Sequence, residues 1–407
     1  MADPAPRRGR LGRGSDPIWR VPGMSPLLLV TVVGFGGFAV LFPVAPLWVV
    51  RGGQGAAGAG LVNGTLLLAT VATQPFVPRA LARLGAGWSL AAAMLLLGLP
   101  AVAMGVSDDL GWALGMSGLR GVGFGVLTVT GSAVVAYLVP AARRGEAIGF
   151  YGLGIAVPNV VLLPASVALA EKVGYWPVFA IGALPLLGVP AALALGRDVA
   201  AVRRGADPLP AQVETSWHRA RGVLGPAAVL FAVTLPGGAL MTFLPQLTDS
   251  SETAFFALLA LGLVAAIGRW RIGRVADRSG ASPLLLPLLL TMVVGLLLTA
   301  LAVAGDDGDA HTAVLLTAVV VVGIGYGTLQ NLTLLVALSR VAPGDYGRAS
   351  AIWNVGFDSG TALGSVLVGL VASSSGFSVA FLVVAGLVVA VLPLTLRSRT
   401  GPGAPGG

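Results

Sequence analysis

Two charged residues, Arg120 and Asp358, lie deep inside long apolar stretches of this 407-residue chain. Each is about nine residues from the nearer end of its stretch, or roughly 13 Å if the stretch is helical. A carboxyl group in apolar surroundings can take up and release a proton in the working pH range, so Asp358 is a candidate proton carrier. The alternative is a fixed structural acid that is hydrogen-bonded to Asn354, one turn earlier, or paired with an arginine.

For Arg120 we weigh contact with an anionic substrate, or adjustment of a proton site, against a packing role in which the guanidinium binds backbone carbonyls. A solute cavity needs a few polar groups among apolar walls, and other apolar stretches of the chain carry large polar side chains. The alternative for each of these is an interhelical hydrogen bond worth about 0.6 kcal/mol. Gln330 and Asn331 are adjacent and point to different sides of a helix, so one of them is expected to face a cavity. The predicted substrate and proton pathway consists of Arg120, Asn159, Gln330, Asn331, Asn354 and Asp358.

The elements that position these residues are predicted to be membrane-spanning helices. The chain is 56% hydrophobic and 10% charged, whereas roughly a quarter of the residues in a soluble domain are charged. A spanning helix needs about 20 mostly apolar residues, and lipid forces the backbone to satisfy its own hydrogen bonds. We therefore predict an all-α membrane protein. The twelve predicted transmembrane helices cover residues 26–50, 57–78, 86–106, 111–138, 147–170, 174–196, 222–246, 253–272, 282–304, 312–339, 349–371 and 376–396.

The distribution of charge predicts the topology. If the N-terminus is cytoplasmic, the cytoplasmic segments hold all of the 25 basic residues except Arg51, Arg120 and Lys172. Acids, such as Asp108 and Asp109, lie on the opposite side instead. This pattern satisfies the positive-inside rule and places both termini in the cytoplasm. The expected divisions are a cytoplasmic tail (1–25), a six-helix bundle (26–196), a cytoplasmic linker (197–221), a second six-helix bundle (222–397) and a disordered tail (398–407).

Composition also excludes several function classes. The chain has no cysteine, and its two histidines, His218 and His311, are expected in connecting segments, so no metal site is predicted. A net charge of +8 would suggest nucleic acid for a soluble domain, but here topology accounts for the arginines, and no nucleic-acid partner is expected. We find no His/Asp/Glu cluster, nucleotide-binding loop or Ser-His pairing. An enzyme and a cofactor are therefore not expected.

The two halves repeat one pattern at an offset of roughly 200 residues, as expected for a parallel repeat that binds its substrate near the membrane midplane. Gly36-Gly37 corresponds to Gly237-Gly238. The loop Pro78–Gly85 corresponds to Gly273–Gly280, and Gly121-Val-Gly-Phe-Gly125 corresponds to Gly323-Ile-Gly-Tyr-Gly327. Because six spans separate equivalent positions, both halves have the same orientation.

These motifs resemble those of the major facilitator superfamily over residues 26–397. Gly273-x-x-x-Asp277-Arg278-x-Gly280 is similar to the loop signature of that superfamily, and Arg120-Gly-x-Gly-x-Gly125 is similar to its fourth-helix motif. Arg143-Arg144-Gly145-Glu146-Ala147 resembles the same region of prokaryotic exporters. The chain departs from the pattern at Ala82, where the first loop lacks its acid, and in the fifth span, which lacks the Gly-Pro-x-x-Gly motif of drug–proton antiporters.

The resemblance implies a monomeric secondary active transporter in the bacterial inner membrane, working by alternating access. We expect proton-coupled efflux, as an antiporter, of a small amphipathic solute. The alternative is a facilitator or a proton-coupled importer of a small metabolite. The expected partners are the solute, protons and the lipid bilayer.

The resemblance also implies a cytoplasmic gate. Asp277 is expected to approach the start of the fifth span near Arg143, Arg144 and Gly145, whereas Ala82 leaves the equivalent contact near Arg348 missing. The predicted gating residues are Gly273, Asp277, Arg278, Gly280, Arg143 and Arg144.

Overall fold

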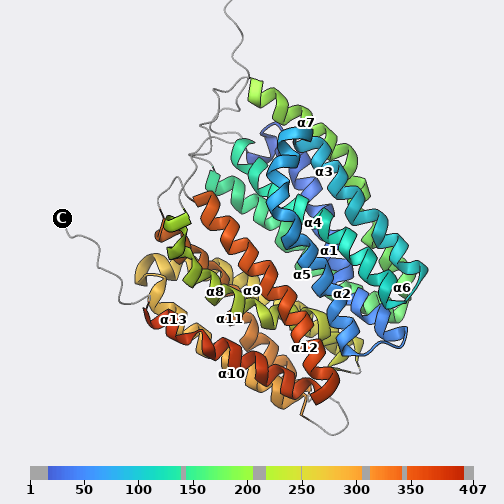
Figure 1. Ribbon diagram of the computed structural model, residues 1–407, viewed down its shortest axis with the longest axis vertical. Coiled ribbons are helices and arrows are strands. Elements are labelled where there is room, and N and C mark those ends of the chain that lie inside the picture. The colour runs from blue at the N-terminus through green and yellow to red at the C-terminus, as the bar shows by residue number, and fades with distance from the viewer. Residues whose placement is uncertain are drawn as a thin grey trace, which may run out of the picture.

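Two groups of helices lie side by side in the computed structural model, one coloured blue to green and the other yellow to red (Figure 1). The structure describes residues 17–138, 144–204, 217–248, 250–304, 312–341 and 346–397. These residues form helices joined by short turns, with no strand among them. The all-α architecture predicted from the sequence is confirmed.

The first half contains the helices that lead up to the linker. Its bounds are α1 (Met24–Arg51), α2 (Ala56–Thr73), the short 3₁₀ helix Gln74–Phe76, α3 (Val77–Ala103), α4 (Leu110–Leu138), α5 (Arg144–Lys172), α6 (Tyr175–Gly182) and α7 (Val189–Arg204). A 3₁₀ turn at Leu184–Gly188 joins α6 to α7, so these two helices make one span.

The second half contains the remaining helices. Its bounds are α8 (Trp217–Phe243), α9 (Ser251–Ser279), α10 (Ser282–Ala302), α11 (Thr312–Ser339), α12 (Tyr346–Ala390) and α13 (Leu392–Arg397). We call the end of the bundle at which α1 begins the arginine-rich end, and the end at which α1 finishes the acidic end.

Ten helical segments of the described chain are long and apolar enough to cross a membrane, and two of them are double spans. Ala56–Val106 and Ala349–Thr395 have 51 and 47 residues, more than twice the roughly 20 residues that one crossing needs. Each reverses direction at a glycine, Gly85 with φ 75° and ψ 169° or Gly376 with φ 80° and ψ 162°. The described residues therefore make twelve spans, as predicted.

The turning glycines occupy equivalent places in the two halves. Gly280, with φ 78° and ψ 155°, separates α9 from α10 as Gly85 separates the second span from the third. Gly174, with φ 118° and ψ 172°, precedes α6 as Gly376 precedes the last span. This region of backbone space is essentially restricted to glycine. Gly85 and Gly280 are also the last residues of the two loop motifs, so the motif has a backbone reason to end in glycine.

The two Gly-x-Gly-x-Gly motifs make equivalent close contacts between helices. A Cβ at Gly121 would meet the Leu66 carbonyl oxygen of α2, and one at Gly125 would meet that of Thr70. The equivalent glycines of α11 pack in the same way on the equivalent residues of α9: a Cβ at Gly323 would meet the Leu261 carbonyl oxygen and one at Gly327 that of Ala265. Small residues let membrane helices approach closely, so each motif fixes the packing of its half.

The halves meet mainly through α2 with α12 and α5 with α9. Near the acidic end, a Cβ at Gly60 would meet the Ser365 carbonyl oxygen, and one at Gly369 would meet that of Ala56. Asn63 donates hydrogen bonds to the Phe42 carbonyl oxygen (2.8 Å) and, across the interface, to Thr242 Oγ1 (2.9 Å). The halves are therefore tightly packed at the acidic end.

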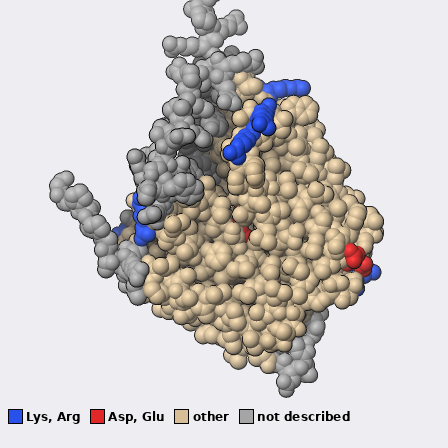
Figure 2. All heavy atoms as spheres, viewed as in Figure 1, with Lys and Arg blue, Asp and Glu red and all other residues tan. Residues whose placement is uncertain are grey.

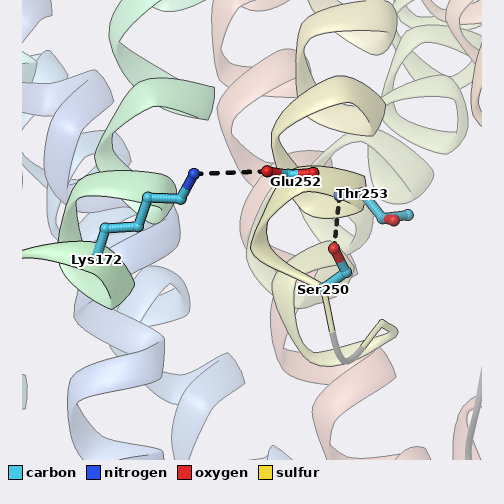
Figure 3. A network of polar contacts seen from close by, with 4 residues as sticks. All are labelled: Lys172, Ser250, Glu252 and Thr253. Atoms are coloured by element: carbon cyan, nitrogen blue, oxygen red, sulfur yellow. Dashed lines mark hydrogen bonds and ion pairs between the residues drawn. The ribbon is translucent and has the colours of Figure 1, made fainter.

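One exposed ion pair also crosses between the halves at the acidic end. Figure 3 shows Lys172, at the end of α5, reaching Glu252 in the first turn of α9, where Ser250 caps the helix by accepting from the Thr253 amide. The Nζ to Oε1 distance is 3.6 Å, and the side chains are 61% and 73% exposed. Such exposed pairs contribute about 0–1 kcal/mol, so this contact alone does not hold the halves together.

The outer surface is apolar between charged edges. Figure 2 shows a broad tan area of uncharged residues, with basic residues at the upper and left edges, acidic residues next to a basic one at the right edge, and one small red spot near the centre. Exposed leucines and valines, such as Leu290, Val294 and Leu297 along α10, belong to this surface. It matches the face that a multi-pass protein presents to lipid.

Three expectations need adjustment. The predicted linker 197–221 is partly helical, because α7 continues to Arg204 and α8 begins at Trp217. His218 therefore lies in a helix rather than in a connection, and His311 lies outside the described residues. The charge pattern assigns Arg269 to a cytoplasmic segment together with the loop arginines, but it lies inside α9, ten residues before the helix ends at Ser279. The positive-inside rule explains every arginine near a span end by topology, so it did not single out Arg269 as a candidate site residue.

Candidate functional site

Asp358 hydrogen-bonds to the opposite half of the protein. Its Oδ2 atom accepts from Gln74 Nε2 at 2.7 Å, and Gln74 lies in the 3₁₀ turn that continues α2. The Asp358 side chain is 9% exposed and forms no ion pair within the described part of the chain. Asn354 is exposed, and the partner proposed from the sequence is thus replaced by Gln74. Asp358 is a buried acid whose hydrogen bond joins the two halves.

Tyr326 of α11 lies near both this acid and a neighbouring arginine. Its hydroxyl lies within electrostatic range of both Asp358 and Arg269, and the Gln330 side chain is within hydrogen-bonding reach of it. The Tyr326 ring is 5% exposed and packs against Gly237 of α8, where a Cβ would collide with it. We call the five residues Gln74, Arg269, Tyr326, Gln330 and Asp358 the inter-half polar cluster.

Arg269 is held by neutral groups of α11. Its Nη1 atom donates to Gln330 Oε1 at 3.3 Å, and Asn331 Nδ2 donates to the Arg269 backbone carbonyl at 2.8 Å. Gln330 is 4% exposed, whereas the Arg269 side chain is exposed. The adjacent residues Gln330 and Asn331 thus both act on Arg269, one on its side chain and the other on its backbone.

Arg120 lies in a separate place within the first half. It is 1% exposed, and its Nη2 atom donates to the Gly37 carbonyl oxygen of α1 at 3.1 Å. Within the described part of the chain, its Nε atom has no hydrogen-bond partner, and the buried hydroxyl of Ser117, one turn earlier on α4, has none either. The carbonyl contact matches the packing role weighed from the sequence, and the unpartnered Nε leaves a donor free for a ligand or water.

The structure brings some of the predicted pathway residues together and leaves others apart. Gln330 and Asp358 share the inter-half polar cluster, and Asn331 borders it. Asn159 donates at 2.7 Å to the Ile155 carbonyl oxygen of its own helix. The described contacts do not connect Asn159, Arg120 or Asn354 to the cluster.

The predicted gate is described only in part. Gly273 lies in α9 with Asn331 Nδ2 3.5 Å from the position of its Cβ, Arg278 is exposed and Gly280 forms the turn. Arg143 and the side chains of Arg144 and Asp277 lie outside the described residues.

Sequence reasoning missed Gln74, Arg269 and Tyr326 as members of one cluster. A repeat signal was available for the first two, because Gln74 precedes Gly85 by as many positions as Arg269 precedes Gly280. They are therefore equivalent residues of the second and eighth spans. Tyr326 carries no comparable signal, since an aromatic residue in a span most often packs against lipid or neighbouring helices.

Twelve spans in two equivalent halves, which meet around buried polar groups, define a multi-pass membrane protein built from a tandem repeat. The chain belongs to the Major Facilitator Superfamily, whose family model matches residues 27–343 and 227–406. The resemblance seen in its motifs is confirmed, and the family is one of membrane transporters rather than enzymes.

Two curated relatives show what the chain is similar to. The inner membrane transport protein YdhP of Escherichia coli K12 is 27% identical over 383 residues, covering 91% of this chain and 94% of the relative. The puromycin resistance protein pur8 of Streptomyces alboniger is 32% identical over 255 residues, covering 60% of this chain and 48% of the relative.

Solved structures share the fold. A bacterial homologue of the human lysosomal transporter Spinster, in an inward-facing and unoccupied conformation, has a TM-score of 0.72 at 15% identity and covers 97% of this chain and 100% of that chain. A single-residue mutant of the nucleoside transporter NupG has a TM-score of 0.66 at 13% identity, with 92% and 99% covered.

Proposed function

We propose that the protein exports a small amphipathic solute across the bacterial cytoplasmic membrane in exchange for protons. The observation that carries this proposal is the Gln74–Asp358 hydrogen bond, because it places a buried, titratable group on the boundary between two halves. In a transporter of this family the halves must separate and close again in each cycle. The protonation of an acid on that boundary therefore depends on which side of the protein is open.

The exchange follows from the surroundings of Asp358. A charged carboxylate is tolerated in a buried site only with strong hydrogen-bond donors, and Gln74 supplies one across the interface. When the halves move apart, that donor leaves and the protonated form is favoured. We therefore propose Asp358 as the proton carrier, with proton uptake and release tied to the separation of α2 from α12. Arg120, buried on α4 with a free donor, is proposed to contact the solute or adjust a proton site within the first half.

The orientation and direction rest on charge and on relatives. We propose that the arginine-rich end and both termini face the cytoplasm, in agreement with the positive-inside rule. Packing of α2 on α12 near the acidic end then corresponds to a state closed to the outside. Export is supported by the similarity to a puromycin resistance protein.

The experiment that tests export compares cells with and without the protein, using puromycin and a panel of amphipathic aromatic compounds of differing charge. We expect lower accumulation of at least one compound in expressing cells, and an uncoupler should abolish the difference. Higher accumulation in expressing cells would indicate import instead, and a difference that resists the uncoupler would indicate a facilitator.

A further inference from the structure

Arg269 lies on the face of α9 that is directed toward the other half. The lipid-facing stripe of α9 is marked by exposed Phe256, Leu263, Ile267 and Trp270. Gly262 lies on a different face and has Val160 of α5 3.6 Å from the position of its Cβ. Residues seven apart on a helix share a face, so Arg269 lies on the same face of α9 as Gly262. It is two helical turns closer to the arginine-rich end than Gly262. Its exposed side chain therefore borders the space between the halves rather than lipid.

No described acid contacts the Arg269 guanidinium directly, although Asp358 belongs to the same polar cluster. Its hydrogen-bond partner in the described structure is the neutral Gln330 amide, and no ion pair joins it to a described carboxylate. A guanidinium has five N–H donors in a fixed fork, and one of them is used here. A cation inside a membrane-spanning segment is costly unless it serves a ligand or a partner, and Arg269 lies within the span Ser251–Gly273.

Repeat symmetry shows that the protein's own acid is absent at this position. The equivalent residue in the first half, Gln74, bonds to Asp358 of α12. Counting from the matched pair Gly154 and Gly356, the residue equivalent to Asp358 in the first half is Ala156 of α5. The neutral amide thus bonds to an acid, whereas the position that the repeat pairs with the Arg269 cation carries only the methyl group of Ala156. A carboxylate supplied by a ligand would complete the second pair.

We propose that Arg269 binds the acidic group of an amphipathic organic anion, with Gln330 orienting the guanidinium and the apolar helices enclosing the body of the molecule. Two oxygens of a carboxylate, sulfonate or phosphate group match the guanidinium fork, which can bind them through two parallel hydrogen bonds. The proposal names the substrate class and rests on the proposed function only in taking the space between the halves as the solute route.

The test is a binding measurement on the purified full chain in lipid nanodiscs. The probes are naphthalene derivatives with the same ring: a carboxylate, a sulfonate, a phosphate, the neutral carboxamide and a primary amine. We expect at least one of the three anions to raise the melting temperature, and the carboxamide and amine not to do so. Arg269→Gln should weaken binding of that anion by about 10- to 100-fold, as for loss of a charged hydrogen bond.

The matched control is Arg271→Gln, which removes the same charge two residues away, where the guanidinium lies over the Trp270 ring on the lipid-facing side. This control should bind the anion as the wild type does. If Arg269→Gln does not fold, Arg269→Lys is compared with Arg271→Lys, and a loss of affinity at position 269 alone is expected because lysine lacks the fork. Equal shifts with anion and carboxamide, absence of any anion shift in the wild type, or equal losses at positions 269 and 271 would overturn the proposal. Because binding is measured without a gradient, a failure of proton-coupled export in cells would leave this result standing.

Discussion

Gln74 Nε2 and Asp358 Oδ2 are 2.7 Å apart although their residues belong to opposite halves of the chain. The amide donates in this bond, and a donated hydrogen bond stabilises a carboxylate more strongly than it stabilises a protonated carboxyl group. The contact therefore connects the charge state of Asp358 to the distance between α2 and α12. The first two predictions concern this pair.

Asp358→Asn should abolish proton-driven transport while the protein still folds and inserts, because asparagine has the size of the acid but cannot carry a proton. Proton-gradient-driven flux of an exported compound into inverted vesicles should fall at least about 10-fold, given the usual cost of losing a group that acts only in the coupled step. Exchange of labelled for unlabelled compound without a gradient should persist. Glu171→Gln, an exposed acid near the acidic end, is the matched control. Uncoupler-sensitive accumulation that survives in Asp358→Asn would remove Asp358 as the carrier.

Gln74→Leu should leave a buried carboxylate without its donor and weaken the packing of the two halves. The cost of an unsatisfied buried group is about 1–3 kcal/mol. The state closed at the acidic end should therefore lose population, which can be followed by spin-label distances between the acidic ends of α2 and α12. In the Asp358→Asn background the same substitution should have a much smaller effect. Equal effects in both backgrounds would show that the two side chains are not coupled.

The fold could be predicted from the sequence because lipid leaves few options. Span number followed from apolar length, and the repeat followed from glycines such as Gly85 and Gly280 that a turn or close contact requires. Asp358 and Gln330 could be singled out because a large polar group inside an apolar span is costly unless it has a structural or functional partner. Their partners could not be predicted, since the Gln74–Asp358 bond crosses from one half to the other and depends on how the halves sit together. Arg269 was missed because its charge also suits a loop, and sequence alone did not separate the two explanations.

Gly60→Val should force α2 away from α12 near the acidic end, because a side chain there meets the Ser365 carbonyl oxygen. We expect the population to shift toward the state that is open at the acidic end. The chain has no cysteine, so a single cysteine at buried Ala59 reports the change through increased labelling from that side. Gly115→Val on α4 is the matched control, because nothing lies within 4 Å of its Cβ position. Identical labelling of the two valine variants would contradict the close contact.

Gly376→Ala should destabilise the protein by about 1–3 kcal/mol, because φ 80° with ψ 162° is a conformation essentially restricted to glycine. Nothing lies within 4 Å of the Cβ position, so any loss of stability reports backbone strain rather than a steric clash. Gly386→Ala, on the following helix and equally unobstructed, should be neutral or stabilising, since alanine favours helix over glycine by about 1 kcal/mol. Thermal unfolding in detergent compares the two variants. A Gly376→Ala protein as stable as Gly386→Ala would mean that this turn does not need glycine.

Asp277→Asn should favour the state open at the arginine-rich end. By the repeat, the acid of the second loop is expected near the start of α5 at Arg143, Arg144 and Gly145. An acid there interacts with the positive end of a helix dipole, worth about 0.3–1 kcal/mol when exposed, and arginine partners add charge-assisted hydrogen bonds.

The first motif carries Ala82 at the position that matches Asp277, so the equivalent contact cannot compensate when Asp277 is neutralised. Asp277→Asn should therefore increase labelling of single cysteines that line the space between the halves near the arginine-rich end. Asp198→Asn, which neutralises an acid of α7 at the same end of the bundle, serves as the matched control and should leave labelling unchanged. The competing explanation is that Asp277 pairs with its neighbours Arg274 or Arg278 near the end of α9, an exposed pairing worth little. In that case Asp277→Asn and Asp198→Asn would label alike, and Asp277 would have no part in gating.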